Sequence, residues 1–190
     1  RDLEKASLTH GLLFPPYTSS KDLCCIGGMV GNNASGEKSL RYGATINSVS
    51  ALKMVCSDGE EYLFSELTES ELEAKKAQGD FEGDVYKKLH TLIVENFDLI
   101  TQSRPRVRKN AAGYGLWNVW DAERKTFNVA KLMVGSQGTL GIITSILLDL
   151  VPAPKYTKMV VVPISNLTEL AAGVKEILAH SPEGLETYDS

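Results

Sequence analysis

Two glycine-rich segments decide how this chain is interpreted: Ile26-Gly-Gly-Met-Val-Gly-Asn-Asn-Ala-Ser-Gly36 and Val134-Gly-Ser-Gln-Gly-Thr-Leu-Gly-Ile-Ile-Thr144. Each sets glycines and small polar residues beside apolar residues that favour β-strands. Glycine allows close approach to the backbone, and successive backbone N–H groups can form an anion-binding concavity. Asn32, Asn33 and Ser35 add side-chain donors to the first segment. We therefore expect both segments to contact a ligand; the alternative at each is a purely structural turn.

The composition is that of an ordinary globular protein. The chain has 190 residues, of which 43% are hydrophobic and 23% charged, and its formal net charge is −4. This length suffices for one well-buried domain and the edge of a second. The acidic balance gives no reason to expect a nucleic-acid partner. One short basic cluster spans residues 104–109; it is either a solvated loop or a loop that faces an anionic substrate.

Processing signals and metal-binding motifs are not evident in the sequence. No apolar run is long enough for a membrane span, and no signal peptide opens the chain. Three cysteines, of which Cys24 and Cys25 are adjacent, form neither a disulfide framework nor a metal quartet. We therefore expect a reduced, cytoplasmic protein without a metal site, in which the three histidines have structural roles. Gly113-Tyr-Gly115 begins a dinucleotide-binding pattern but lacks the third glycine, so a nicotinamide-binding domain is not expected.

Hydrophobic periodicity predicts an α+β fold, with an antiparallel or mixed sheet flanked by helices. Residues 17–48 lack periodicity and are predicted to be a functional loop, whereas residues 66–82 are polar and expected to be exposed. Asp58-Gly59 is a strong hairpin signal. The expected helices cover residues 2–8, a stretch that begins at Asp84, and 167–178 with Ser165 or Asn166 as N-cap. The expected strands are 49–57, 61–64, 129–134, 142–151 and 158–162.

The motifs also resemble a known family. Phe14-Pro-Pro, Cys25-Ile-Gly-Gly-Met-Val-Gly-Asn-Asn-Ala-Ser-Gly, Leu40-Arg-Tyr-Gly and the second glycine segment together resemble the flavin-binding domain of the vanillyl-alcohol oxidase / p-cresol methylhydroxylase superfamily. The likeness is greatest to its D-lactate dehydrogenase, glycolate oxidase and D-2-hydroxyglutarate dehydrogenase branch. It covers residues 8–154, and the expected fold corresponds to the second subdomain of that flavin-binding domain.

The resemblance implies a set of positions that contact non-covalently bound FAD. The first group is Ser19, Ser20, Cys24, Cys25, Gly27, Gly28, Asn32, Asn33, Ala34, Ser35, Gly36 and Gly43. The second is Gln137, Gly138, Thr139, Leu140, Gly141, Ile142 and Ile143, where Gln137 replaces the glutamate usual in the family. Glutamine keeps an acceptor oxygen, adds a donor and removes a charge. The two cysteines are expected to serve in packing.

The resemblance also implies a reaction. It predicts part of an FAD-dependent oxidoreductase that oxidises a small 2-hydroxy acid by hydride transfer to the flavin. Lys109, Asn110 and Tyr114 are candidates for the substrate side, since their segment resembles one near the active site in this branch. Two alternatives stay open: an FAD-linked alcohol or sugar oxidase, and a non-catalytic scaffold that has lost its flavin.

The chain resembles the middle of a longer flavoprotein. Pro152-Ala-Pro154 is the predicted boundary between an FAD-binding domain (1–154) and the beginning of a substrate-covering cap domain (155–190). Nothing matches the family's pyrophosphate-binding loop, which precedes this region. We therefore expect the isolated chain to be inactive and to bind FAD weakly or not at all. The expected partners are a hydroxy-acid substrate, the remaining segments of the parent protein and an electron acceptor.

Overall fold

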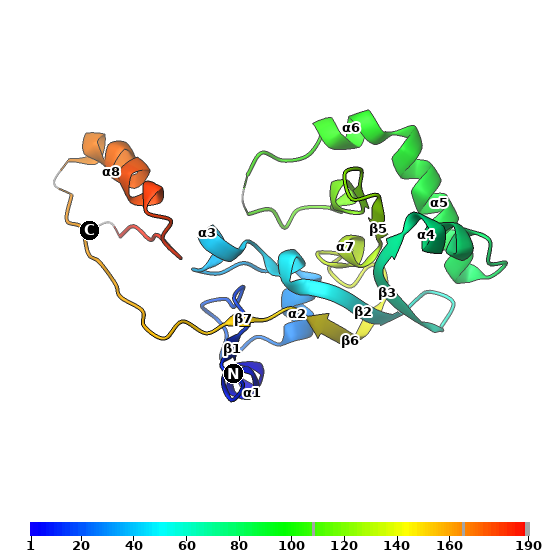
Figure 1. The fold of residues 1–190 in the computed structure, drawn as a ribbon, viewed down its shortest axis with the longest axis horizontal. Coiled ribbons are helices and arrows are strands. Elements are labelled where there is room, and N and C mark those ends of the chain that lie inside the picture. The colour runs from blue at the N-terminus through cyan, green and yellow to red at the C-terminus, as the bar shows by residue number, and fades with distance from the viewer. Residues whose placement is uncertain (108, 165, 189–190) are drawn as a thin grey trace.

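The computed structural model describes residues 1–107, 109–164 and 166–188, and it confirms the predicted α+β class. Its body is built on a five-stranded sheet with the order β4-β5-β3-β2-β6, in which every neighbouring pair is antiparallel (Figure 1). The strands are β2 (Val49–Val55), β3 (Glu61–Thr68), β4 (Trp120–Asp121), β5 (Thr126–Asn128) and β6 (Ile142–Leu148). The predicted hairpin joins β2 to β3, and Gly59 has the left-handed φ of +88° that its turn requires.

Helices and a small second sheet surround this framework. β1 (Leu12–Leu13) pairs with β7 (Val151–Pro152), which ties the N-terminal segment to the end of the body. The helices are α1 (Asp2–Leu8), α2 (Ile26–Gly31), α3 (Ser39–Tyr42), α4 (Glu69–Lys76), α5 (Phe81–Glu95), α6 (Phe97–Gln102), α7 (Ala130–Met133) and α8 (Leu167–Ala179), with 3-10 turns η1 (Thr45–Ser48) and η2 (Leu116–Asn118).

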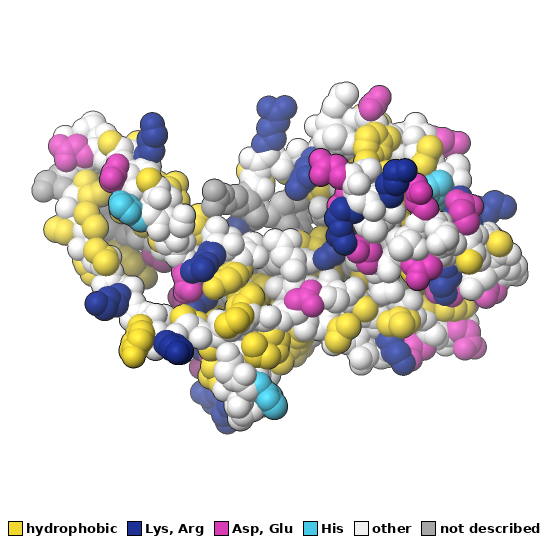
Figure 2. Space-filling model, in the orientation of Figure 1, with side chains coloured by type: hydrophobic (Ala, Val, Ile, Leu, Met, Phe, Trp, Pro, Cys, Tyr) yellow, Lys and Arg dark blue, Asp and Glu magenta, His cyan; other side chains and the backbone are white. Residues whose placement is uncertain are grey.

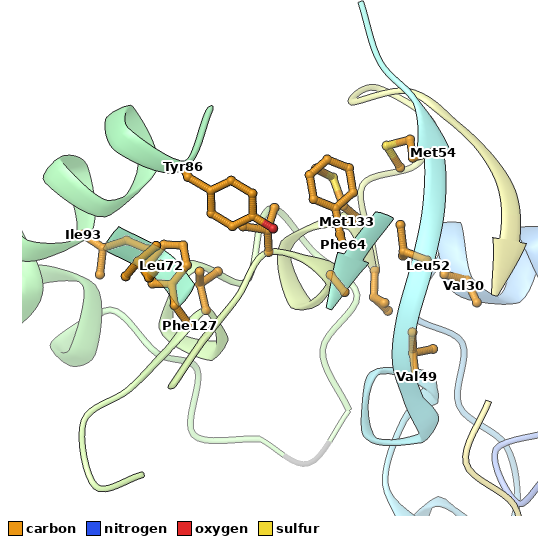
Figure 3. Close-up of a cluster of buried hydrophobic side chains, with 14 residues drawn as sticks. Val30, Val49, Leu52, Met54, Phe64, Leu72, Tyr86, Ile93, Phe127 and Met133 are labelled. Carbon is orange, nitrogen blue, oxygen red and sulfur yellow. The ribbon is translucent and has the colours of Figure 1, made fainter. Parts of the chain in front are cut away.

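The larger of two hydrophobic clusters connects the sheet to the helices that pack against it. Figure 3 shows Tyr86 of α5 reaching from its helix towards Phe64 of β3, while Val30 of α2 packs behind Leu52 of β2. The rings of Tyr86 and Phe127 lie 6.3 Å apart, centre to centre. Burial of these side chains fixes α2 and α5 relative to β2, because core packing resists displacement. The first glycine segment is thereby anchored to the sheet.

The stretch from Val129 to Val134, predicted as a strand, is mostly helical. α7 occupies Ala130–Met133, and the backbone N–H of Met133 donates to the carbonyl of Val129 at 3.2 Å. Alanine, lysine, leucine and methionine all favour helix, and this local preference prevails over the strand that the sequence predicted. The strand in this region is β5, which ends at Asn128.

The polar stretch 66–82 is mostly exposed, as predicted, but it also contains regular structure that its composition did not suggest. It contains the end of β3 and the whole of α4, whose Leu72 is 2% exposed. The Thr68 side chain caps the helix by accepting from the backbone N–H of Glu71, and the Glu71 carboxylate accepts from the backbone N–H of Thr68 in return. This capping box starts a helix that a purely compositional argument missed.

The segment after Pro154 lies apart from the body. Residues 158–162, predicted as a strand, form none, and Met159 is 89% exposed because no strand of the described chain lies beside it. The predicted helix is present as α8, with Asn166 as its cap; the alternative cap, Ser165, lies outside the described residues. Figures 1 and 2 show α8 as a separate lobe. Its return segment contacts α3 through Glu183, whose carboxylate accepts from Lys38 Nζ at 2.9 Å.

Candidate functional site

The two glycine-rich segments meet in the folded chain. The backbone N–H of Gly135 donates to the carbonyl of Val30 at 2.9 Å, and that of Gln137 donates to Gly31 at 2.8 Å. The Gln137 side chain adds a third link, because its Nε2 donates to Asn32 Oδ1 at 2.9 Å. The segments therefore form one continuous surface rather than two separate turns.

The first segment begins as a helix, which corrects the prediction of a loop over residues 17–48. Cys25 is the N-cap of α2, and Gly27 and Gly28 lie within the helix with ordinary negative φ. The apolar residues of this helix explain the difference, since Met29 and Val30 are both buried against the body. Burial of this face drives helix formation despite the poor helix propensity of glycine.

Two helical glycines leave open space above the surface. A Cβ built on Gly27 or on Gly31 would have no heavy atom within 4 Å, apart from atoms of the helix itself and of the chain neighbours. Neither residue has a positive φ, so the fold requires glycine at neither position. A glycine inside a helix costs about 0.5–1 kcal/mol relative to alanine. A flat ligand laid across α2 is a physical reason for bearing that cost, so this part of the site fits a flavin cofactor.

Other glycines of the site have a packing role instead. A Cβ on Gly36 would overlap the carbonyl oxygen of Tyr17, and a Cβ on Gly141 would overlap that of Val55 and lie 2.7 Å from Met54 Cγ. Both residues let two parts of the chain pass closely. The structural interpretation of the glycines is therefore correct at these positions, while Gly27 and Gly31 remain available to a ligand.

Left-handed backbone occurs at two non-glycine residues of the surface. Asn33 has φ of +47° and Gln137 has φ of +56°. Such conformations are uncommon outside glycine and concentrate at functional sites. At Asn33 the side chain holds the conformation in place: its Oδ1 accepts from the backbone N–H of Ile46 at 3.0 Å, and its Nδ2 donates to the carbonyl of Asn110 at 3.1 Å.

The hydrogen bond from Gln137 also sets the orientation of Asn32. Because Asn32 Oδ1 accepts from Gln137, its Nδ2 donor is directed away from that contact. Asn32 is exposed, so this donor is accessible to a ligand. A glutamate at position 137 would have no proton to donate to Oδ1. Glutamine at position 137 therefore keeps the Nδ2 donor of Asn32 directed outward from the surface.

Of the three predicted substrate-side residues, Asn110 and Tyr114 form hydrogen bonds with the glycine-rich segments, whereas Lys109 is exposed. Asn110 joins the first glycine segment through the bond to Asn33 described above. The hydroxyl of Tyr114 lies 2.7 Å from Thr139 Oγ1 of the second segment. Lys109 is exposed and forms no ion pair within the described part of the chain. The segment that carries them thus lies against both halves of the candidate surface.

The remaining predicted contact residues differ in their exposure. Ser19, Ser20 and Cys25 are exposed, Cys24 is half-buried against the small cluster that includes Phe14, and Ala34 is buried in that cluster. Ser35 is half-buried beside Gly36, and Gly43 adopts φ of +77° after α3. Gly138, Thr139, Leu140 and Ile143 continue from Gln137 into β6, where Ile142 is 72% exposed.

Sequence reasoning missed two residues whose hydrogen bonds to backbone carbonyls support the candidate site. Lys131 of α7 donates through Nζ to the carbonyls of Ile46 and Val49, at 2.6 and 3.1 Å. Burial lowers the pKa of this lysine, and the charge of Asp149 opposes that effect. Thr45 is fully buried and donates through Oγ1 to the carbonyl of Ala34 at 2.7 Å. The sequence gives no signal for either role, because each contact joins residues distant in the chain.

Metal and membrane features are absent from the described part of the molecule. Across residues 1–107, 109–164 and 166–188, no group of three or more His, Cys, Asp and Glu side chains lies close enough to hold a metal ion. Among the same residues, no helix has the length and apolarity that a membrane span requires.

Comparison with known proteins finds similarity to an FAD binding domain and to dehydrogenases and oxidases of hydroxy acids. Residues 1–64 match the model of the FAD binding domain family. The chain is 30% identical over 188 residues to D-2-hydroxyglutarate dehydrogenase of Pseudomonas putida, covering 99% of this chain and 19% of that protein. It is 29% identical over 187 residues to D-lactate dehydrogenase of Anaerostipes hadrus (97% and 28%). It is 27% identical over 190 residues to glycolate oxidase subunit GlcD of Bacillus subtilis (99% and 29%).

The chain thus spans 19% to 29% of the length of these relatives. The similarities confirm the predicted resemblance to the D-lactate dehydrogenase, glycolate oxidase and D-2-hydroxyglutarate dehydrogenase branch. They also confirm FAD as the cofactor of this type of domain, and dehydrogenases and oxidases as its enzyme class.

Proposed function

We propose that this chain is part of an FAD-dependent oxidoreductase that oxidises a small 2-hydroxy acid, and that its two glycine-rich segments form one face of the FAD site. The observation that carries the proposal is the direct hydrogen bonding between those segments, from Gly135 to Val30 and from Gln137 to Gly31 and Asn32. The names of the relatives support the substrate class. In the proposed domain division, residues 1–154 belong to the FAD-binding domain and residues 155–190 begin a cap domain.

Each part of the face has a distinct task in this proposal. The glycines of α2 admit the cofactor close to the helix backbone, and the outward Nδ2 of Asn32 donates to an oxygen of the cofactor. Asn33 holds the loop after α2 against the segment that contains Asn110. Bound FAD would supply the hydride acceptor. The chain's own residues bind and orient it, while Tyr114 and Thr139 close the surface beside it.

A titration of the intact chain with FAD tests the face directly. Of the two outcomes that the sequence leaves open, weak binding and no binding, the assembled face favours weak but saturable quenching of flavin fluorescence. Gly31→Ala is the most informative variant, because the new methyl group enters open space in the protein and the position prefers alanine for stability. It should raise the free energy of unfolding by up to about 1 kcal/mol. At the same time it should weaken FAD binding by about tenfold, or about 1.4 kcal/mol.

Gly79→Ala is the matched control. Its Cβ also meets no heavy atom within 4 Å and its φ is not positive, but it precedes α5, away from the glycine-rich segments. We expect it to leave FAD affinity unchanged. Absence of saturable FAD binding to the unmodified chain, or equal affinity in the Gly31→Ala variant, would contradict the proposed face. A scaffold that has lost its flavin would give the first of these results.

We further propose that the chain alone does not turn over substrate. Dye reduction by D-lactate or glycolate, measured with the chain and added FAD, should stay at the rate of free FAD. Reduction above that rate would overturn this part of the proposal.

A further inference from the structure

A cavity of about 470 Å³ lies beside the proposed FAD face. One wall consists of α3 and the turn that leads from Gly43 to Asn47, and the opposite wall consists of residues from the described stretches 104–107 and 110–118. Asn33 and Gly135 close the end towards the glycine-rich segments. Sites for small molecules commonly have a volume of about 300–1,000 Å³, so this cavity can hold one.

The lining carries cationic and amide groups but no carboxylate. Arg41 and Arg104 are the charged side chains among the described lining residues, and none of those residues is Asp or Glu. A second cavity of about 280 Å³, next to α1, is lined by both signs of charge, with Asp2 and Glu4 among them. Of these two cavities, only the larger one therefore has a lining that favours an anion.

Two groups of the lining retain hydrogen-bonding capacity. Arg104 forms no ion pair with any residue that the structure describes, and the side-chain amide of Asn118 has no hydrogen-bond partner among the same residues. The other basic group, Arg41, lies 3.7 Å from the Glu183 carboxylate and is already partly neutralised. Asn33 and Asn110 are engaged with each other and shape the wall. These two donors, Arg104 and Asn118, thus lie on the same wall of the cavity.

We propose that this cavity binds the carboxylate of a small organic acid, with Arg104 as the principal recognition group and Asn118 as an additional donor. The inference rests on the proposed function, because it assigns the cavity to the acid that the flavoprotein oxidises. A guanidinium presents paired N–H donors that match the two oxygens of a carboxylate. The shared residue Asn33 puts the bound acid next to the proposed FAD face, as transfer of hydride between substrate and cofactor requires.

Figure 2 shows basic side chains standing over the loop between α6 and η2, the stretch that forms this wall. Arg106 belongs to the same exposed loop but does not line the cavity, so it provides a matched control for Arg104. Both arginines are exposed, and replacement of either by glutamine keeps polarity while removing one charge.

The test is a titration of the intact chain with D-2-hydroxyglutarate and with D-lactate, followed by NMR chemical shifts at low ionic strength. We expect saturable shifts in residues of the cavity wall. Arg104→Gln should weaken binding by at least about tenfold, the usual effect of losing a hydrogen bond to a charged group, whereas Arg106→Gln should bind as the unmodified chain does. Absence of saturation, or equal losses in the two variants, would overturn the inference. Thermal unfolding of both variants checks that the fold is retained.

FAD titrations of the same variants separate this inference from the proposed function. Arg104→Gln should bind FAD with unchanged affinity. If Arg104→Gln loses FAD binding, or if ADP displaces the acid, the cavity holds the phosphates of the cofactor. The inference then fails, but the proposed FAD face stands. If FAD binds but neither acid does, the inference fails alone. If the acids bind and FAD does not, the proposed function fails and the cavity remains a carboxylate site.

Discussion

At the scale of single residues, buried polar groups offer the sharpest tests of the core. The hydroxyl of Tyr86 is buried and has no hydrogen-bond partner among the described residues. An unsatisfied buried group costs about 1–3 kcal/mol. We expect Tyr86→Phe to raise the free energy of unfolding by about 1 kcal/mol, measured by urea denaturation. Tyr62→Phe is the contrasting variant: Tyr62 donates to Asp58 at 2.5 Å, so its loss should lower stability. A fall in stability for Tyr86→Phe would contradict this account.

His90 should make stability depend on pH. Its ring packs against Trp120 and Phe127, and burial lowers its pKa; nearby Lys76 lowers it further, while Glu73 opposes the effect. The unfolded chain therefore binds the proton more strongly than the folded one, between the lowered pKa and the ordinary value near 6.5. The stabilisation that neutral His90 provides is fully present above a pH of about 6.5. It is lost as the pH falls from there through the lowered pKa of the folded state.

The measurement is urea unfolding at a series of values between about pH 8 and pH 5. The free energy of unfolding of the unmodified chain should fall relative to that of His90→Gln as the pH decreases. A constant difference between the two proteins would show that His90 titrates identically in both states.

At the scale of secondary structure, the start of α4 can be tested through its cap. Thr68→Ala removes the side-chain acceptor for the backbone N–H of Glu71 and half of the capping box. Loss of such a cap costs about 1 kcal/mol of stability. Glu69→Ala, one residue further along, removes a side chain from the same exposed turn without removing the cap. Denaturant unfolding should show a clear loss for the first variant and little for the second.

How far the elements could be predicted depends on whether local signals agreed with tertiary contacts. The Asp58-Gly59 turn is a local feature and was predicted correctly. The helix predicted from Asp84 is present as α5, but it begins at Phe81, where Asp80 caps it. Thr68-x-x-Glu71 is also a local helix signal, but the polar composition around it obscured it. The exposed run from Met159 to Val162 has the side chains of a strand, yet a strand requires a partner, and none lies beside it in the described chain.

The two segments of the candidate site could be singled out from the sequence, but their arrangement in space could not. The glycine-rich segments could be recognised from spacing and resemblance. Their mutual hydrogen bonds, such as that from Gln137 to Asn32 across 105 residues of sequence, could not, because nothing local encodes them. The sequence likewise does not distinguish the roles of Gly36 and Gly31. Gly36 is required because the backbone of Tyr17 lies close to it, whereas Gly31 faces open space.

At the scale of the whole molecule, the body and the C-terminal lobe should be energetically independent. No residue of α8 is buried among those that the structure describes, and the lobe contacts α3 mainly through Glu183. Truncation after Pro154 keeps the β1–β7 pair and the bond from Ala153 N–H to the Gly11 carbonyl. We expect it to shift the unfolding temperature by no more than about 2–4 °C in calorimetry. A loss much larger than this would show that the lobe contributes to the folding unit of the body.

The hydrogen bonds between residues 30–32 and 135–137 have a kinetic consequence. A contact across so long a stretch closes a large loop, and its entropic cost must be met by other interactions first. The β2–β3 hairpin joins strands that are adjacent in the chain, whereas the proposed FAD face requires residues 135–137 to reach residues 30–32. During synthesis on the ribosome, the first glycine-rich segment therefore emerges long before its counterpart. Flavin capture by the proposed face would come late in folding, because a nascent chain that ends before Val134 would offer only the first of its two segments.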